Sequence, residues 1–145
     1  MLSRWLVTVF VISGGKTAAK GLTTSVYSLE NNVWTELPPM AIERRYHSCA
    51  FFDDHIYVLG GKALKSTEIL DLATNTWSFG PELPGTFKAG QAFTFQDALY
   101  AMDRLGTFLK LDDDKAGWSE VAAVKKTGIR LVYPVLVVDY DILHC

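Results

Sequence analysis

Hydrophobic residues along this chain gather in short runs of four to six, rich in β-branched and aromatic side chains. Turn-forming pairs separate the runs, among them Asn31-Asn32, Asp53-Asp54 and Gln96-Asp97. Runs bounded in this way predict β-strands. An apolar spacing of 3.6 residues is not sustained over ten residues anywhere, so no helix is expected. The pattern therefore predicts an all-β protein.

The same order of strands and turns repeats along the chain. Related segments recur as "VFVISGG" (9–15) and "IYVLGG" (56–61), and as "VYSLENNVW" (26–34), "ILDLATNTW" (69–77) and "FLKLDDDKAGW" (108–118). The tryptophans Trp34, Trp77 and Trp118 are consequently spaced by 43 and then 41 residues. Units of about four short strands that repeat at this interval predict the blades of a β-propeller.

The residues within each unit separate two propeller families whose repeats have this length. No tryptophan precedes an aspartate and no Gly-His pair opens a unit, so WD40 repeats do not fit. A strand that ends in Gly-Gly, followed by Tyr27, six residues and Trp34, resembles the kelch repeat. "RRYHSCAFFDDHIYVLGG" at 44–61 is closely similar to kelch sequences. The resemblance covers nearly the whole chain and implies a partial kelch-type β-propeller.

We expect three four-stranded blades plus a fragment of a fourth. The first, at 9–37, lacks its first strand, and the second occupies 44–84. The third, at 88–122, is degenerate because Asp103-Arg104 replace the glycine pair, so its turn should be rebuilt. The next blade begins at 130–145.

Propellers typically close with about 4 to 8 blades, which is more than these 145 residues supply. We expect a fragment of a longer kelch protein. A second expectation is a homodimer that completes a six-bladed ring, in which residues 136–140 of one chain give the missing inner strand to the other. An open half-ring is the third.

The repeated residues are expected to be structural. Paired glycines at a strand end allow positive φ and close approach of neighbouring strands; they are Gly14, Gly15, Gly60 and Gly61. Tyr27 belongs to the same repeated pattern. Each repeat tryptophan should fill the gap between wedge-shaped blades, where burial of about 150–250 Å² contributes roughly 4–6 kcal/mol before entropy is counted.

The stretch "VFVISGGKT" at 9–17 has two other interpretations. A phosphate-binding loop requires a glycine where Phe10 stands, and Lys16 has a repeat counterpart in Lys62, so the repeat explains this stretch better. A secretion signal would combine Arg4, an apolar run and cleavage after Ala19. Cleavage there would remove a strand that matches the second blade, so we favour the strand.

The resemblance also implies where a partner binds. In kelch propellers the loop leading into the first strand of a blade helps to form one mouth of the central channel, and "ERRYH" at 43–47 matches that loop. The partner-binding candidates are Arg44, Arg45, Tyr46, His47, Lys88 and Arg130. A basic and aromatic mouth suits an acidic peptide, because Arg and Tyr are favoured interface anchors. The alternative is that these residues are solvated charges or bond to neighbouring carbonyl groups.

Charge and composition exclude several other classes. Fourteen Lys and Arg against sixteen Asp and Glu give a net charge of −2, so no nucleic-acid partner is expected. The apolar runs fall short of the roughly 20 residues of a membrane helix, so no membrane partner is expected either. Cys49 and Cys145, the two cysteines, lie 96 residues apart without a CxxC pair, which indicates neither a zinc nor a disulfide framework and predicts reduced, packed thiols.

No arrangement of residues predicts catalysis. The three histidines share no metal-ligand spacing, and "DDDK" at 112–115 lacks the pattern of a calcium loop. We therefore expect no metal, no cofactor and no enzymatic activity.

By resemblance the chain is expected to be a cytoplasmic protein-binding module, like the substrate-recognition part of BTB-kelch adaptors of ubiquitin ligases. The alternative is a secreted carbohydrate-binding or carbohydrate-active kelch protein.

Overall fold

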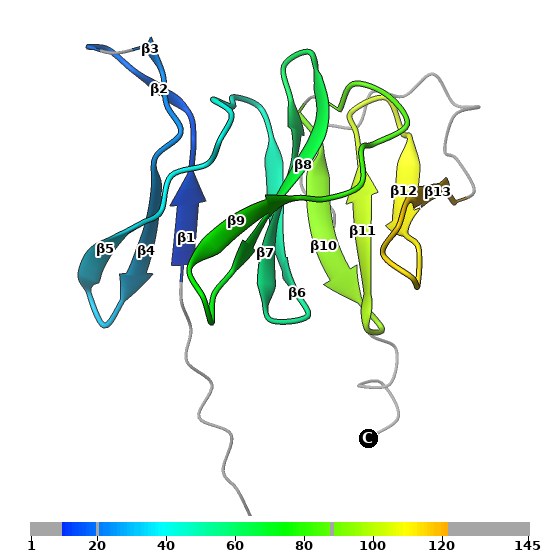
Figure 1. Cartoon of the computed structure of the whole chain (residues 1–145). Coiled ribbons are helices and arrows are strands. Elements are labelled where there is room, and N and C mark those ends of the chain that lie inside the picture. The colour runs from blue at the N-terminus through cyan, green and yellow to red at the C-terminus, as the bar shows by residue number, and fades with distance from the viewer. Residues whose placement is uncertain (1–9, 20, 88, 122–145) are drawn as a thin grey trace, which may run out of the picture.

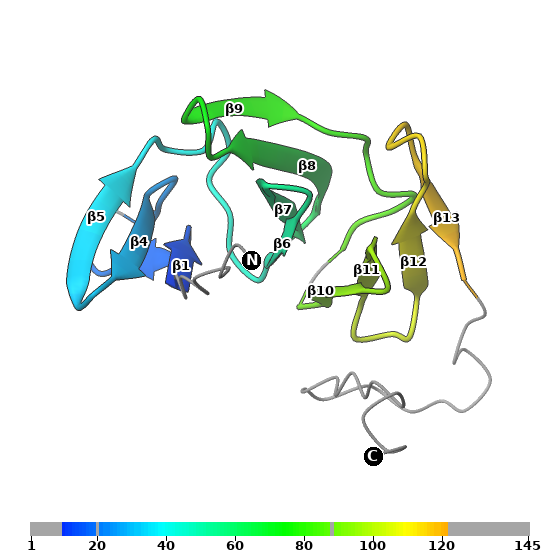
Figure 2. The ribbon, with the colours of Figure 1, turned by 90° about the horizontal axis from the view of Figure 1, so that it is seen from below.

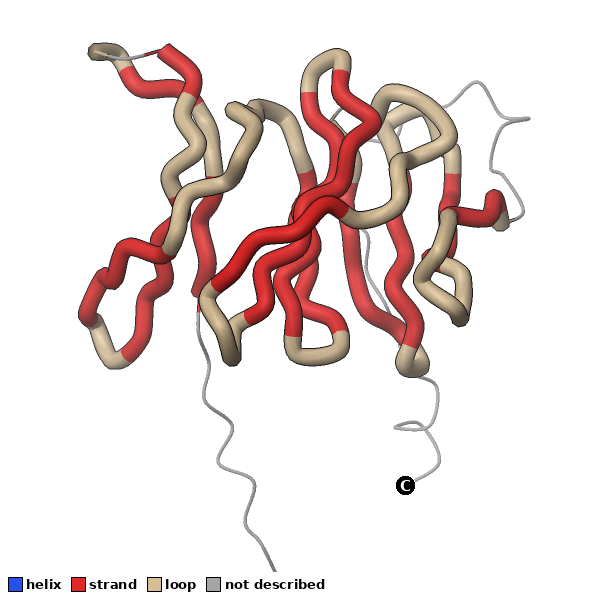
Figure 3. Tube along the Cα trace, in the orientation of Figure 1, coloured by secondary structure: helices blue, strands red, loops and turns tan. Residues whose placement is uncertain are grey.

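The computed structural model describes residues 10–19, 21–87 and 89–121, and every regular element in this part of the chain is a β-strand (Figure 3). The strands are β1 (Phe10–Ser13), β2 (Lys16–Thr17), β3 (Gly21–Leu22), β4 (Val26–Glu30), β5 (Val33–Leu37), β6 (Ser48–Phe52), β7 (His55–Gly61), β8 (Leu64–Asp71), β9 (Thr76–Phe79), β10 (Gln91–Phe95), β11 (Ala98–Met102), β12 (Phe108–Leu111) and β13 (Trp118–Glu120). The predicted all-β class is confirmed.

Three antiparallel sheets stand side by side (Figure 1). Blade 1 is β1-β4-β5, with the β2–β3 hairpin beyond it, blade 2 is β6-β7-β8-β9 and blade 3 is β10-β11-β12-β13. Seen from below, the sheets fan out in an arc, with β6 and β10 on the inside and β5, β9 and β13 on the outside (Figure 2). This arrangement confirms the predicted partial propeller. The expected start of a further blade at 130–145 lies outside the described residues.

Strand β7 is buried on both faces because it lies inside blade 2, which packs against blade 1 on one face and blade 3 on the other. Its alternating side chains point to opposite sides, as the two-residue period of a strand requires. Ile56 and Val58 join the hydrophobic cluster shared with blade 1, whereas Tyr57 and Leu59 join the cluster shared with blade 3. The hydrophobic core of this protein thus consists of layers between sheets.

The glycine pairs connect each blade to the linker that follows it. Gly14 and Gly60 have φ of 62° and 61°. A Cβ at Gly60 would lie 2.5 Å from the carbonyl oxygen of Phe87, and one at Gly14 would lie 2.7 Å from that of Arg44. The second glycine of each pair donates its N–H to the same carbonyl, at 2.8 Å for Arg44 and 2.7 Å for Phe87. Phe87 therefore occupies in one linker the place that Arg44 has in the other.

Blade 3 forms its turn without a glycine pair. The buried Asp103 accepts hydrogen bonds at Oδ1 from the N–H groups of Leu105 (2.8 Å) and Thr107 (2.9 Å). Gly106, three residues further on, takes the positive φ of 83°. An aspartate side chain and a displaced glycine thus rebuild the turn.

Two of the three repeat tryptophans link neighbouring blades. The indole N–H of Trp77 donates to the carbonyl of Pro38 at 2.6 Å, and that of Trp118 donates to the carbonyl of Pro81 at 3.2 Å. Trp118 is only 8% exposed, whereas Trp34 in blade 1 is 52% exposed. Trp34 has no blade in front of it among the described residues, and Tyr27 on β4 is also exposed.

Candidate functional site

The predicted partner loop lies on the upper edge of the propeller in Figure 1, where the chain enters β6. Residues 43–47 form this loop, and the β7–β8 turn at Lys62 and Ala63 lies against it because the N–H of Lys62 donates to the carbonyl of Arg45 at 2.9 Å. We call these seven residues the upper rim.

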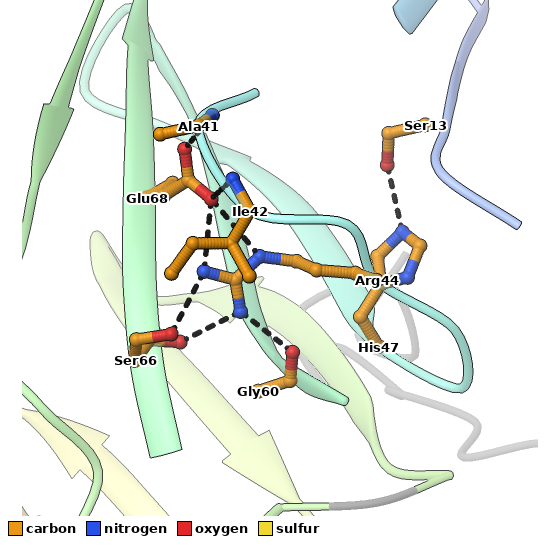
Figure 4. A network of polar contacts seen from close by, with 8 residues as sticks. All are labelled: Ser13, Ala41, Ile42, Arg44, His47, Gly60, Ser66 and Glu68. Carbon is orange, nitrogen blue, oxygen red and sulfur yellow. Dashed lines mark hydrogen bonds and ion pairs between the residues drawn. The ribbon is translucent and has the colours of Figure 1, made fainter. Parts of the chain in front are cut away.

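Arg44 is the centre of a buried polar network within the upper rim and blade 2 (Figure 4). Its guanidinium donates to Glu68 through Nε (3.2 Å) and Nη2 (3.0 Å), to the Gly60 carbonyl, and to both the carbonyl and the hydroxyl of Ser66. These contacts use all five N–H groups of the guanidinium. The ion pair is fully desolvated, since Arg44 is 0% exposed.

The carboxylate oxygens of Glu68 also accept hydrogen bonds from the linker that precedes Arg44. Its carboxylate accepts the backbone N–H of Ala41 at 2.6 Å and that of Ile42 at 3.1 Å. The Arg44–Glu68 pair therefore fixes the path of the chain from blade 1 into blade 2.

Burial corrects the prediction that Arg44 contacts a partner. Arginine was expected at the mouth because it pairs well with carboxylates, but the carboxylate that it pairs with is the internal Glu68. A guanidinium with every donor used and no exposed surface has nothing to offer a partner. For Arg44 the structure agrees with the alternative interpretation of the sequence, in which the side chain bonds to neighbouring carbonyl groups.

Tyr46 and Arg45 are accessible in this loop, and the Glu43 side chain is exposed as well. Tyr46 is 55% exposed, and the Cζ atom of the partly buried Arg45 lies 5.6 Å from the centroid of the Tyr46 ring. A guanidinium over an aromatic face is a favourable cation–π contact. The two side chains thus form one amphipathic, positively charged unit at the surface.

The backbone at Tyr46 is in the left-handed region, with φ of 58°. This conformation is uncommon for a bulky residue. Ala89, at the matching position of the next repeat, has φ of 50°, and its N–H donates to the carbonyl of Tyr46 at 2.8 Å. The left-handed conformation recurs at this position of the repeat, and a tyrosine is energetically less favourable there than a glycine or an asparagine.

His47 joins blade 2 to blade 1. Its Nε2 is 2.8 Å from the hydroxyl oxygen of Ser13, at the end of β1. Burial, together with the nearby charge of Arg44, lowers the pKa of His47 below its usual value, so the imidazole is neutral at neutral pH. Its predicted role as a partner residue stays a prediction, while its visible contact is between blades.

Lys62 is a residue of this site that the sequence prediction missed. Its side chain is exposed, and its backbone bond to Arg45 brings it beside the predicted loop. The sequence did contain an indication of Lys62, because Lys16 and Lys62 each follow a glycine pair and so occupy the same position of the repeat. Lys88 and Arg130, also predicted to contact a partner, lie outside the described residues.

Three further observations concern other chemistry. Cys49 is a free thiol but exposed, which corrects the expectation of packing. No group of three or more metal-ligating side chains occurs among the described residues. No helix in the described part of the chain is long and apolar enough to cross a membrane.

Comparison with known proteins identifies a repeat family. The model of the Kelch motif matches residues 43–84. An F-box/kelch-repeat protein of Arabidopsis thaliana is 28% identical over 137 residues, covering 78% of this chain and 32% of the relative. Kelch repeat and BTB domain-containing protein 2 of Ectromelia virus is 29% identical over 96 residues, covering 62% of this chain and 17% of the relative.

A human relative, Kelch repeat and BTB domain-containing protein 6, is 26% identical over 111 residues, covering 72% of this chain and 16% of that protein. The chain thus spans a third or less of the length of these relatives. The matched segment, 43–84, contains the strands of blade 2 and the Arg44–Glu68 pair.

Proposed function

Because this chain belongs to the kelch-repeat proteins, we propose that it is a non-enzymatic interaction module whose upper rim binds a peptide or protein. The observation that carries the proposal is Tyr46, an exposed tyrosine in a left-handed conformation beside Arg45. Strained residues persist where function retains them, and aromatic residues and arginines are favoured interface anchors.

The charge of the upper rim supports an acidic partner. Arg45 and Lys62 both lie at this surface, against one exposed carboxylate, Glu43, so the accessible charge of the upper rim is positive. The positive charge of Arg44 does not contribute, because Glu68 neutralises it inside the protein. A carboxylate-bearing peptide could pair with Arg45 and pack on the Tyr46 ring.

A role as the substrate-recognition part of a ubiquitin-ligase adaptor is the finer part of the proposal. It is supported by the relatives whose names combine kelch repeats with an F-box or a BTB domain. A cytoplasmic location goes with this role. The alternative, a secreted carbohydrate-binding or carbohydrate-active protein, would require cleavage after Ala19, which would remove β1.

Affinity capture from a cell extract tests the upper rim. The wild-type chain is compared with the double variant Arg45→Ala/Tyr46→Ala, and bound proteins are quantified by mass spectrometry. Ala89 already occupies the matching left-handed position, so alanine is compatible with this backbone. We expect the specific partners to fall by about tenfold or more, since anchor residues contribute about 2 kcal/mol or more each.

Phe79→Ala is the matched control, because Phe79 is an exposed aromatic residue on β9, outside the upper rim. It should retain the partners of the wild type. If the double variant recovers the same partners in the same amounts, the upper rim is not the binding surface.

Self-association is a second part of the proposal. The face of blade 1 with Ile12, Tyr27 and Trp34 exposes apolar groups, whereas the tryptophans of blades 2 and 3 bond to a neighbouring linker. We expect light scattering at micromolar concentration to give twice the 16.1 kDa of one chain, and Trp34→Ala to give the single mass. A wild-type chain of single mass would exclude the homodimer.

A further inference from the structure

A cavity of about 510 Å³ is lined by residues of turns that lie at the lower edge of the propeller in Figure 1, opposite the upper rim. It is situated between blades 2 and 3. The β6–β7, β10–β11 and β12–β13 turns surround it, and each of them contributes lining residues. We call this space the lower cavity.

The walls of the lower cavity are apolar and are held in place by contacts between the blades. Phe51, Phe52, Ala98 and Leu111 line it. The hydroxyl of Thr94 on β10 donates to the carbonyl of Phe51 on β6 at 2.7 Å, which ties the two inner strands together. Phe51 is nevertheless 57% exposed, so an aromatic surface remains open to solvent.

The mouth of the lower cavity is acidic. Asp53, Asp97, Asp112 and Asp113 line it, and Lys115 is the one cationic lining residue. Asp97 forms no side-chain hydrogen bond or ion pair with the residues that the structure describes. Carboxylates beside exposed aromatic faces are the groups that bind a guanidinium or ammonium group.

Lys115 shows how a cation sits in this place. Its ammonium group pairs with Asp53 across the two blades and lies 5.7 Å from the centroid of the Phe52 ring. The same ion pair lowers the pKa of Asp53 and raises that of Lys115. The protein itself therefore supplies one example of a cation bound by a carboxylate and an aromatic ring here.

The surrounding edge has the same sign of charge. Within the described residues, the turns of this edge and the strand ends next to them carry eight carboxylates against two lysines: Glu30, Asp53, Asp54, Asp71, Asp97, Asp112, Asp113 and Asp114 against Lys110 and Lys115. A surface of one sign attracts and orients a partner of the opposite sign.

We propose that the lower cavity binds an arginine or lysine side chain of a basic peptide segment. The cation is expected between Asp97 and the Phe51 ring, with the neighbouring carboxylates holding a second basic residue. This site is independent of the upper rim. The propeller would thus bind partners of opposite charge on its two edges.

Fluorescence anisotropy with a labelled Gly-Arg-Gly-Arg-Gly peptide tests the proposal on the full chain. The same peptide with citrulline in place of both arginines keeps the shape and removes the charge. We expect saturable binding of the arginine peptide at about 50 mM salt, where screening is weak, and binding about tenfold weaker for the citrulline peptide.

Three variants locate the binding. Asp97→Asn removes a charge and no side-chain contact within the described residues, and it should weaken binding by about threefold; Asp53→Asn/Asp97→Asn should weaken it by about tenfold. Lys115→Gln removes the internal competitor and should strengthen binding. Asp54→Asn is the matched control: Asp54 shares the turn of Asp53 but does not line the cavity, and its φ of 60° suits asparagine.

Three results would overturn the proposal: no binding of the arginine peptide, equal binding of the citrulline peptide, or an equal loss with Asp54→Asn and Asp97→Asn. The last would mean that a diffuse field attracts the peptide and the cavity does not hold it. Circular dichroism confirms that each variant is folded. Arg45→Ala/Tyr46→Ala should leave this binding unchanged, which separates it from the function proposed for the upper rim.

Discussion

Replacing Arg44 with alanine should lower the free energy of unfolding by about 3–5 kcal/mol, the range observed when one partner of a buried ion pair is removed. The substitution would leave the Glu68 carboxylate buried without its cation and the carbonyl groups of Gly60 and Ser66 without their donor. Urea unfolding followed by far-ultraviolet circular dichroism measures the change.

Arg104→Ala is the matched control for charge and size, because Arg104 is exposed. It should change stability by less than about 0.5 kcal/mol, as is usual at the surface. A similarly small effect of Arg44→Ala would show that its guanidinium is accessible in solution, and Arg44 would return to the set of partner candidates.

Trp118→Ala is expected to have an effect of similar size, about 3–5 kcal/mol, because it opens a cavity in the layer between blades 2 and 3. It also removes the donor that reaches the carbonyl of Pro81. Trp118→Phe should cost less than Trp118→Ala, since it retains most of the apolar volume and loses the hydrogen bond, worth about 1 kcal/mol, together with a small part of the packing. The same urea titration gives both values.

Phe79→Ala serves as the control for losing a large apolar side chain, because Phe79 is 63% exposed. Its effect should stay below about 1 kcal/mol, since little buried surface is lost. Equal losses for Trp118→Ala and Phe79→Ala would contradict the view that the repeat tryptophans hold the blades together.

The architecture could be predicted from the sequence because its signals are local and repeated. Pairs such as Asn31-Asn32 and Asp53-Asp54 have the positive φ that tight hairpin turns require, and few other residues tolerate it. The glycine pairs also have positive φ, and the first glycine of each pair stands where a Cβ would collide with a linker carbonyl group. A strand period of two and a unit spacing of 43 and 41 residues were sufficient to predict an all-β partial propeller.

The candidate site could be predicted only in part, because burial depends on neighbours that are distant in the sequence. Arg44 and Arg45 are adjacent and chemically identical, yet Arg44 is paired with Glu68, 24 residues away, while Arg45 reaches the surface beside Tyr46. The lower cavity was not predicted at all. Its lining comes from three turns and the strand ends beside them, and no one of these segments indicates a binding site alone.

The sequence by itself determined the strands, their turns and their grouping into kelch blades, because backbone conformation follows local residue preferences and the repeat multiplies a weak signal. The tertiary structure alone decided which charges are neutralised inside and which face solvent. That outcome depends on how the blades pack: packing buried Arg44 against Glu68, exposed Tyr46, and brought carboxylates from blades 2 and 3 to one acidic mouth.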